Sequence, residues 1–249
     1  MLAEERYARI CELVTTQGTV TAQELCDRLD ASPSTIRRDL EHLDAEGRLA
    51  RVHGGAASVQ GRLSTRDQAM SDKYGMNADE KTGIARLAAS LVEPDDFVFV
   101  DAGTSTERLV DYLTETRATF VTNSIPHARK LALKGCRTIM LGGELKSDTE
   151  ALVGPTALNA VAQYHFTKGF WGTNGFTAED GFTTPDVNEA MVKRLSMAHT
   201  AACYVLCDAS KLGCVAPVTF ADADDATVIT DSSADSRYLR LKNVMEASL

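Results

Sequence analysis

The chain has 249 residues, of which 44% are hydrophobic and 24% are charged, and its formal net charge at pH 7 is −9. This length allows two domains with their own cores, and the composition is typical of a soluble globular protein. No apolar run is long enough to cross a bilayer and no basic-then-apolar leader is present, which predicts a cytoplasmic protein without a membrane partner.

The first 55 residues predict a helix pair. Residues 2–16 place Tyr7, Ile10 and Leu13 on one stripe, which indicates a first helix. Thr21 and Glu24 have the spacing of a capping box, and this predicts a second helix over residues 22–30. A short α-helical domain therefore begins the chain.

A third helix follows almost at once. Ser32 suits the N-cap position and Pro33 the first helical position. Ile36, Leu40 and Leu43 recur at helical spacing, so they face inward. The side chains left outward are those of a recognition helix that meets base edges in DNA, namely Ser34, Thr35, Arg37, Arg38, Glu41 and His42.

A short strand is predicted after this helix. Gly47 ends the helix, residues 49–53 alternate apolar and polar side chains, and Gly54 begins a turn. These features predict a winged helix-turn-helix domain over residues 1–56, with Arg51, His53 and Gly54 in the wing. Surface arginines are common in helices that bind nothing, so the prediction of DNA binding depends on the capped helices, the hydroxyl groups, the paired arginines and the wing together. The acidic net charge predicts weak non-specific binding and the need for two DNA-binding domains at once.

Residues 57–76 are rich in small and polar side chains and are predicted to be a linker. Asn77 and Glu80 have capping-box spacing, which predicts a helix that stops near Pro94. Beyond it, short apolar runs alternate with helical stretches at residues 97–100, 119–121, 138–141, 169–172 and 204–207. This alternation predicts that residues 77–249 form an α/β domain with a mostly parallel sheet and a ligand at the carboxyl ends of its strands.

Small and polar residues follow each of these strands. After the first strand, Gly103 permits close approach of a phosphate, and the free N–H groups of a helix start lie beside Thr104, Ser105 and Thr106. The run lacks the endings of a P-loop and of a dinucleotide fingerprint. The other residues expected around the ligand are Asp101, Thr122, Asn123, Ser124, Gly142, Gly143, Thr173, Gly175 and Lys211, with Glu144, Asp186 and Glu189 as possible further contacts.

The six cysteines lie mostly in apolar segments and form no C-x-x-C pair. A core position is the better account of each than a zinc site. We therefore expect no metal and no cofactor.

Two sets of strings carry a resemblance to the DeoR family of bacterial transcriptional regulators. The first is SPSTIRRDLEHLDAEGRLARVHGGA in the small domain, and the second comprises EKTGIARLAASLV, DAGTST, VTNS, LGGEL and DASKLG in the large domain. The resemblance implies a winged helix that binds operator DNA and a sugar-phosphate-sensing domain similar in fold to ribose-5-phosphate isomerase. It places the effector loop at residues 101–106. We expect a repressor that acts as a dimer or tetramer. Residues 152–176 look closest to members that govern the use of phosphorylated ketohexoses, such as fructose or tagatose.

Two alternatives remain beside a regulator. One is a sugar-phosphate isomerase with an appended helix-turn-helix, in which Asp101 or Glu189 would act as the base; no acid–base pair is evident in the sequence. The other is a winged helix that contacts a protein, which fits the acidic charge but leaves the arginine and hydroxyl surface without a purpose. We expect a regulator that is not an enzyme.

Overall fold

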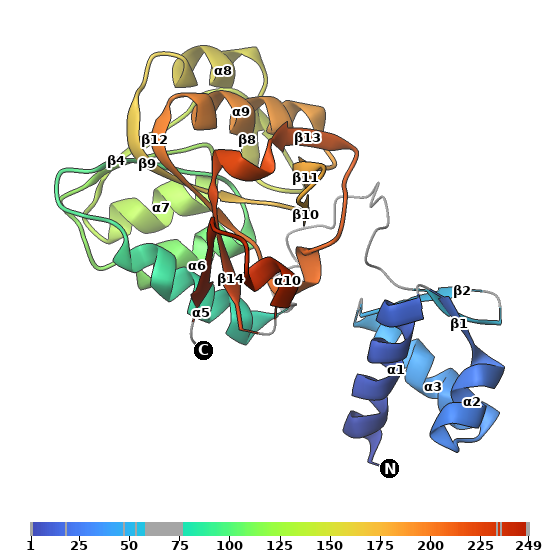
Figure 1. The fold of residues 1–249 in the computed structure, drawn as a ribbon. Coiled ribbons are helices and arrows are strands. Elements are labelled where there is room, and N and C mark those ends of the chain that lie inside the picture. The colour runs from blue at the N-terminus through green and yellow to red at the C-terminus, as the bar shows by residue number, and fades with distance from the viewer. Residues whose placement is uncertain are drawn as a thin grey trace. The chain divides into compact units, whose positions relative to one another are not determined.

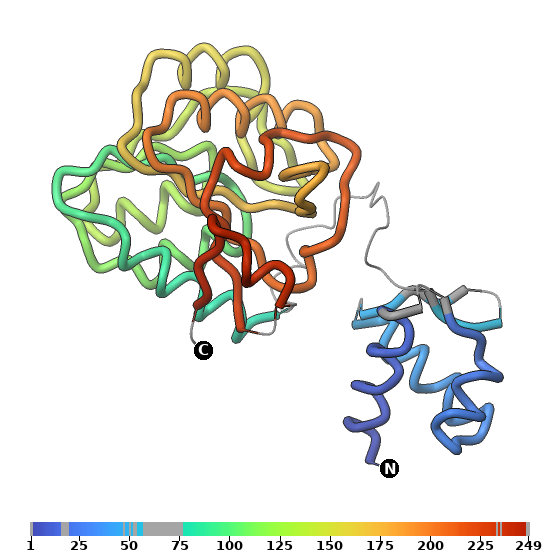
Figure 2. Tube along the Cα trace, in the orientation of Figure 1, coloured from blue at the N-terminus to red at the C-terminus, as the bar shows by residue number. Residues whose placement is uncertain are grey.

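The computed structural model describes residues 2–17, 19–46, 48–52, 54–57, 77–232, 234 and 236–247, which Figure 1 draws in colour, and Figure 2 traces the chain along its Cα atoms in the same orientation. The chain divides into two compact units, Met1–Arg62 and Leu63–Leu249, called here the small and the large unit. All of the predicted linker except Ala57 lies outside the described residues, as does Gly47. The predicted domain boundaries therefore stay predictions.

The small unit has three helices and a three-stranded antiparallel sheet of order β1-β3-β2. Its elements are α1 (Ala3–Gln17), β1 (Thr19–Thr21), α2 (Ala22–Leu29), α3 (Pro33–Ala45), β2 (Ala50–Val52) and β3 (Gly55–Ala57). The three predicted helices and the wing strand are present, and the winged helix-turn-helix fold is confirmed. Sequence reasoning missed β1 and gave bounds to only one strand of the wing hairpin, because three-residue strands show too little alternation to be recognised.

The predicted caps fix the turn between α2 and α3. The Thr21 hydroxyl accepts the Glu24 N–H at 3.1 Å, while the Glu24 carboxylate accepts the Thr21 N–H at 2.9 Å, so this capping box is confirmed. Asp30 ends α2 in the left-handed conformation at φ 48°. The Ser32 hydroxyl then accepts the Thr35 N–H at the start of α3. Ile36, Leu40 and Leu43 are buried with α1 and α2 side chains, which leaves the polar side of α3 exposed.

The large unit is built on a seven-stranded sheet in which every neighbouring pair is parallel, with the order β15-β14-β12-β9-β4-β5-β6. Its strands are β4 (Phe97–Val100), β5 (Thr119–Thr122), β6 (Arg137–Met140), β9 (Phe166–Gly172), β12 (Thr200–Leu206), β14 (Thr227–Asp231) and β15 (Val244–Ala247). The predicted parallel sheet is confirmed, and the five predicted strands correspond to β4, β5, β6, β9 and β12.

Helices cover both faces of this sheet. Two buried clusters lie on opposite faces, one with α5 (Ala78–Ser90), α6 (Thr104–Tyr112) and α7 (Ile125–Leu133), the other with α8 (Pro155–Val161) and α9 (Val187–Ala198). Figure 1 shows α8 and α9 on one side of the strands and α5, α6 and α7 on the other. Two-sided burial explains why strands such as β4 are continuously apolar.

Smaller elements surround the sheet. A hairpin joins β7 (Glu144–Lys146) to β8 (Ala151–Val153), and a second sheet has the order β10-β11-β13. The remaining elements are β10 (Gly175–Thr177), β11 (Gly181–Thr184), β13 (Val218–Ala221), the 3₁₀ helices Ala209–Lys211 and Ala223–Asp225, and α10 (Ser236–Leu239).

The strand order reverses between β4 and β9. The chain runs outward from β4 through β5 to β6, returns to β9 on the other side of β4, and continues outward through β12 to β15. In such sheets, the crevice at the carboxyl ends of the two strands that flank the reversal is where ligands bind. The topology therefore places a candidate site beyond Val100 and Gly172.

The predicted capping box at the start of α5 is wrong. Asn77 adopts the left-handed conformation at φ 51° and its side chain does not cap the helix. The Asn77 amide instead donates to the Asp208 carboxylate at 2.9 Å and to the Ser210 hydroxyl at 3.1 Å. A tertiary contact therefore replaces the local one.

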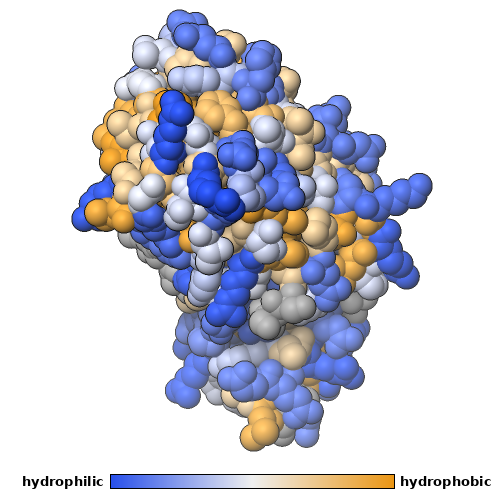
Figure 3. Space-filling model, turned by 90° about the vertical axis from the view of Figure 1, so that its left-hand side faces the viewer, coloured by the Kyte–Doolittle hydropathy of each residue, from blue (hydrophilic) through white to orange (hydrophobic). Residues whose placement is uncertain are grey.

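Some hydrophobic side chains reach the surface of the large unit. Figure 3 shows hydrophobic residues in patches between hydrophilic ones on one face. The large exposed hydrophobic residues of this unit include Ile125, Met140, Leu145, Val187 and Met191. Each helix in the described part of the chain is too short or too polar to span a bilayer.

Candidate functional site

The polar side of α3 presents most of the predicted DNA contacts. Ser34, Arg37 and Arg38 are exposed and Thr35 is half-buried. The Ser32 hydroxyl lies 2.9 Å from the Ser34 hydroxyl and 2.8 Å from that of Thr35, so the hydroxyl groups gather at the helix start. Among the described residues, Arg38 has no hydrogen-bond or ion-pair partner, which leaves its guanidinium available for an external anion or base.

One carboxylate connects α3 to the wing. Glu41 Oε1 lies 3.0 Å from Nη1 of Arg51 on β2 and 3.9 Å from Nε of Arg37. The Arg51 backbone N–H also donates to the Asp44 carboxylate at 2.8 Å. The wing arginine is thus held against the helix by two acids.

The other predicted contacts differ in their surroundings. The His42 ring packs on Tyr7 of α1 with ring centroids 4.8 Å apart, and its Nε2 lies 3.1 Å from Glu46 Oε1. Gly54 is exposed in the turn between β2 and β3, where its carbonyl accepts the Ala22 N–H. His53 lies outside the described residues.

Arg6 of α1 contacts an acidic side chain of α3. Its guanidinium donates to the buried Asp39 carboxylate at 2.5 and 3.1 Å. Arg6 therefore forms an ion pair inside the small unit.

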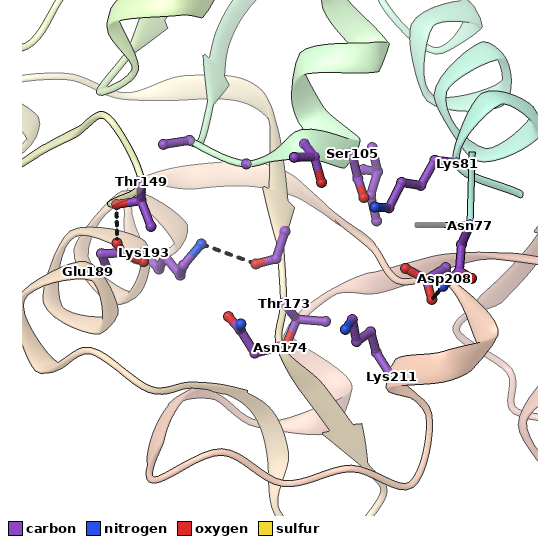
Figure 4. A pocket seen from close by; sticks show the side chains of 15 residues that line it. Asn77, Lys81, Ser105, Thr149, Thr173, Asn174, Glu189, Lys193, Asp208 and Lys211 are labelled. Carbon is purple, nitrogen blue, oxygen red and sulfur yellow. Dashed lines mark hydrogen bonds between the residues drawn. The ribbon is translucent and has the colours of Figure 1, made fainter. Parts of the chain in front are cut away.

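A cavity in the large unit opens at the reversal point of the sheet. Its walls come from the segments after β4, β9 and β12, from the start of α5 and from α9 (Figure 4). The lining residues are Asn77, Lys81, Ala102, Gly103, Thr104, Ser105, Thr149, Gly172, Thr173, Asn174, Glu189, Lys193, Leu206, Asp208 and Lys211. Of the predicted ligand contacts, Gly103, Thr104, Ser105, Thr173 and Lys211 are among them.

One side of the cavity favours an anion. The first turn of α6 begins at Thr104 without a side-chain cap, and the N–H groups of a first helical turn have no carbonyl partners within the helix. Lys81 and Lys211 both line the cavity, and Figure 4 shows Lys81 beside Ser105 and Lys211 beside Thr173. In the described residues, the Lys211 ammonium makes no hydrogen bond or ion pair. Helix N–H groups and ammonium groups together suit a phosphate.

The other side carries hydrogen-bonding groups suited to hydroxyls. The Glu189 carboxylate accepts the Thr149 hydroxyl at 2.6 Å and the Lys146 ammonium at 2.9 Å. Figure 4 shows Thr149, Glu189 and Lys193 together, across the cavity from Lys81 and Lys211. Asn174 adds an amide to the lining. The cavity is therefore polar at both ends.

Asp101 supports the cavity from behind. Its buried carboxylate accepts the Lys193 ammonium, and that ammonium also donates to the Gly172 carbonyl at 3.1 Å. Burial raises the pKa of the Asp101 carboxyl, and the Lys193 ammonium opposes that rise. The pair joins the ends of β4 and β9 to α9, and Asp101 is not among the residues that line the cavity.

A second buried network holds the loop that begins α6. The Thr106 hydroxyl donates to the Asp101 and Gly103 carbonyls, lies 3.2 Å from His127 Nε2, and does not line the cavity. His127 Nδ1 contacts the hydroxyl of Ser124, which caps α7. Burial lowers the pKa of His127 to about 4, so its imidazole is neutral at pH 7. Ser124 and Thr106 thus position the loop through a neutral histidine.

The remaining predicted contacts also lie outside the lining. Thr122 and Asn123 are buried; the Asn123 side chain accepts the Ala102 N–H at 3.0 Å and thereby orients the loop after β4. Gly142 and Gly143 lie in the exposed turn before β7, where a Cβ on Gly143 would lie 2.5 Å from the Val153 carbonyl oxygen. A Cβ on Gly175 would lie 2.4 Å from the Cys214 carbonyl oxygen. Close backbone packing explains these two glycines.

Sequence reasoning missed Lys81, Lys193 and Asn77 as cavity residues. Lys81 and Lys193 lie inside helices, where a lysine has the same sequence signature as a solvated one. The spacing of Asn77 and Glu80 predicts a helix cap, which hides the role of Asn77 in the cavity. For Lys193 the available signal is its spacing of one helical turn from Glu189 on α9, a residue already noted as a possible contact.

Within the described residues, His, Cys, Asp and Glu side chains form no group of three that could hold a metal ion. Some of the polar cavity residues contact one another, as Thr149 does Glu189 and Asn77 does Asp208. Together, a winged helix with exposed arginines and an α/β unit with a polar cavity define a DNA-binding regulator that carries a sensor.

The sequence comparisons identify the family. Residues 6–62 match the DeoR-like helix-turn-helix domain, and residues 76–232 match the DeoR C terminal sensor domain. The chain belongs to the DeoR family of transcriptional regulators, as the sequence motifs predicted.

Two relatives match along nearly their full length. The chain is 40% identical to the "Uncharacterized HTH-type transcriptional regulator FruR" of Bacillus subtilis (strain 168), with 100% of this chain and 98% of that protein covered. It is 32% identical to the "Lactose phosphotransferase system repressor" of Streptococcus mutans serotype c (strain ATCC 700610 / UA159), with 99% of each covered. Among solved structures, ribose 5-phosphate isomerase A from Methanocaldococcus jannaschii is similar over 55% of each chain, with 14% identity and a TM-score of 0.40.

Proposed function

We propose that this protein represses a sugar-utilisation operon by binding its operator through α3 and the wing. A phosphorylated sugar that binds in the cavity of the large unit then lowers the affinity for the operator. The observation that carries this proposal is the cavity itself, which combines the uncapped start of α6 with Lys81 and Lys211 at one end and hydroxyl-binding groups at the other.

On the DNA side, Arg37 or Arg38 would read guanine in the major groove and the other would hold a phosphate. The hydroxyls of Ser34 and Thr35 add short-range contacts, and Arg51 adds a contact from the wing. Because a single acidic chain binds DNA weakly, we propose a dimer or tetramer that presents two α3 helices to successive half-sites. The exposed hydrophobic residues of the large unit, which include Met140 and Leu145, offer surface for such assembly.

On the ligand side, the phosphate would bind the N–H groups at Thr104 and Ser105 together with the ammonium groups of Lys81 and Lys211. The sugar hydroxyls would then meet Asn174, Glu189 and Thr149. A phosphorylated ketohexose, such as fructose or tagatose phosphate, fits a cavity with phosphate-binding groups at one end and hydroxyl-binding groups at the other. The name of the lactose phosphotransferase system repressor, a relative along the whole chain, agrees with a carbohydrate signal.

Isomerase activity is the alternative function. It needs a carboxylate base directed at the substrate carbon that loses its proton. The Glu189 carboxylate is engaged by Lys146 and Thr149, and the Asp101 carboxylate by Lys193. Incubation with ketose and aldose phosphates tests this alternative, and interconversion at an enzymatic rate would support it.

The test of the regulator proposal begins with selection of duplexes from random-sequence DNA by the full chain. A thermal-shift screen of phosphorylated and unphosphorylated sugars follows, and each sugar that raises the melting temperature is added to the selected duplex complex. We expect a shared duplex motif and its release by a phosphorylated sugar. Absence of any enriched motif would contradict operator binding, and a response to unphosphorylated sugars alone would contradict the phosphate site.

A further inference from the structure

Glu41 lies in the middle of the surface that should meet DNA. It shares one side of α3 with Ser34, Arg37 and Arg38, because these positions follow the spacing of three and four residues that aligns helical side chains. Its side chain is 50% exposed, so its carboxylate is in contact with solvent on this surface. An acid placed there opposes the approach of DNA phosphates.

The same carboxylate contacts two of the arginines proposed to bind DNA. Its Oε1 is 3.0 Å from Arg51 Nη1 and 3.9 Å from Arg37 Nε. Arg51 lies on β2, so this contact joins the wing to the recognition helix. Asp44 holds the backbone of Arg51 in addition, which leaves Glu41 to orient its guanidinium.

We propose that Glu41 is a specificity-determining residue that lowers the affinity for non-operator DNA and positions Arg51 and Arg37 for the operator. This inference rests on the DNA-binding surface assigned above. Non-specific DNA binding depends almost entirely on basic side chains that neutralise phosphates. A carboxylate that partly neutralises Arg51 therefore weakens non-specific binding directly. Operator binding depends on base contacts as well, and these benefit from guanidinium groups held in a fixed direction.

Because Glu41 is exposed, its substitution should affect DNA binding more than folding stability. Exposed ion pairs contribute little to stability, so loss of the Glu41 contacts should leave folding almost unchanged. The charge acts on DNA binding instead, where phosphates approach the same surface. The effect should therefore appear in salt dependence and in the ratio of operator to non-operator affinity, and not in melting temperature.

The experiment compares the full-length wild type with Glu41→Gln, Glu41→Ala and the control Glu12→Gln. Glu12 forms an exposed ion pair with Arg9 on α1, at 3.1 Å, so its substitution removes the same charge from the same unit. Affinity is measured by fluorescence anisotropy for the selected duplex and for a scrambled duplex of equal composition, over a range of salt concentrations.

For Glu41→Gln we expect affinity for the scrambled duplex to rise about threefold to tenfold at low salt, with a log–log salt slope steeper by about 0.9. The ratio of selected to scrambled affinity should fall. Glu41→Ala should lower this ratio further, because the hydrogen bond to Arg51 is lost as well. Glu12→Gln should behave as the wild type does.

Three outcomes overturn parts of this account. An unchanged ratio and slope in Glu41→Gln, with a wild type that prefers the selected duplex, would overturn the role of Glu41 alone. An equal change in Glu12→Gln would assign the effect to total charge and would also overturn it. A wild type without any preference for the selected duplex would overturn the proposed function, and the role of Glu41 with it.

Discussion

The two units present their binding groups in different ways. On the small unit, one helix carries Ser34, Arg37 and Arg38 on its exposed side, and β2 adds Arg51. In the large unit, the cavity takes side chains from α5, α9 and the segments after β4, β9 and β12. A surface on one helix tolerates substitutions of its members one at a time, whereas a cavity made by many segments depends on the buried contacts that hold those segments together.

The largest expected effect is therefore on a buried contact behind the cavity. Asp101→Ala leaves the Lys193 ammonium buried without its carboxylate, which should destabilise the large unit by about 3–5 kcal/mol. Ligand binding should be lost with it. Urea denaturation of the full chain measures the loss. Asp111→Ala, in a partly exposed pair with Lys130 at 2.8 Å, is the control and should cost at most about 1 kcal/mol.

The double variant Asp101→Ala/Lys193→Met sharpens this prediction. It removes the uncompensated charge, so it should recover a substantial part of the lost free energy of unfolding. Equal destabilisation in the single and double variants would contradict the assigned role of the pair.

The next effect concerns His127 and acid. Its pKa in the folded chain is about 4 against an ordinary 6.5, so the unfolded chain binds more protons between these values. The free energy of unfolding should therefore decrease as the pH falls through this window, by about 2 kcal/mol between pH 7 and pH 5 for this group. His127→Gln should show a flatter pH dependence, followed by the fluorescence of the single tryptophan, Trp171, in urea.

His165→Gln, at an exposed position, provides the comparison for removal of a histidine that is not buried. If His127→Gln keeps the wild-type pH dependence of the free energy of unfolding, then the buried histidine does not make the large unit sensitive to acid.

A smaller effect is expected on the DNA surface. Arg38→Ala should weaken operator binding by roughly 1–3 kcal/mol, because each good base contact of an arginine has about this value. Melting temperature and ligand binding should remain unchanged, since Arg38 is exposed. Gel-shift titration checks the change against Arg9→Ala on α1, and equal effects of the two substitutions would contradict the recognition-helix assignment.

The same contrast explains how much could be predicted from sequence. The helices of the small unit could be predicted, because caps and helical spacing are local: Thr21 with Glu24, and Ile36 with Leu40 and Leu43, behave as their spacing indicates. The alternation of strands and helices was enough to predict the parallel sheet of the large unit.

The cavity could be predicted only in part. Gly103, Ser105 and Lys211 follow strands directly, so the topology of a parallel sheet brings them to the site. Lys193 and Asn77 reach it through tertiary contacts with Asp101 and Asp208, which no local pattern encodes.

The most direct measurement of the central claim is the affinity of the full chain for its selected duplex during titration with fructose and tagatose phosphates. The wild type should release the duplex with at least one of these ligands and not with the unphosphorylated sugar. For Lys211→Ala, release should need a ligand concentration at least about tenfold higher, because a hydrogen bond to a charged group contributes roughly 1.5–3 kcal/mol. The exposed control Lys242→Ala should respond as the wild type does. Release at the same ligand concentration in Lys211→Ala, or no release by any phosphorylated sugar, would contradict the account.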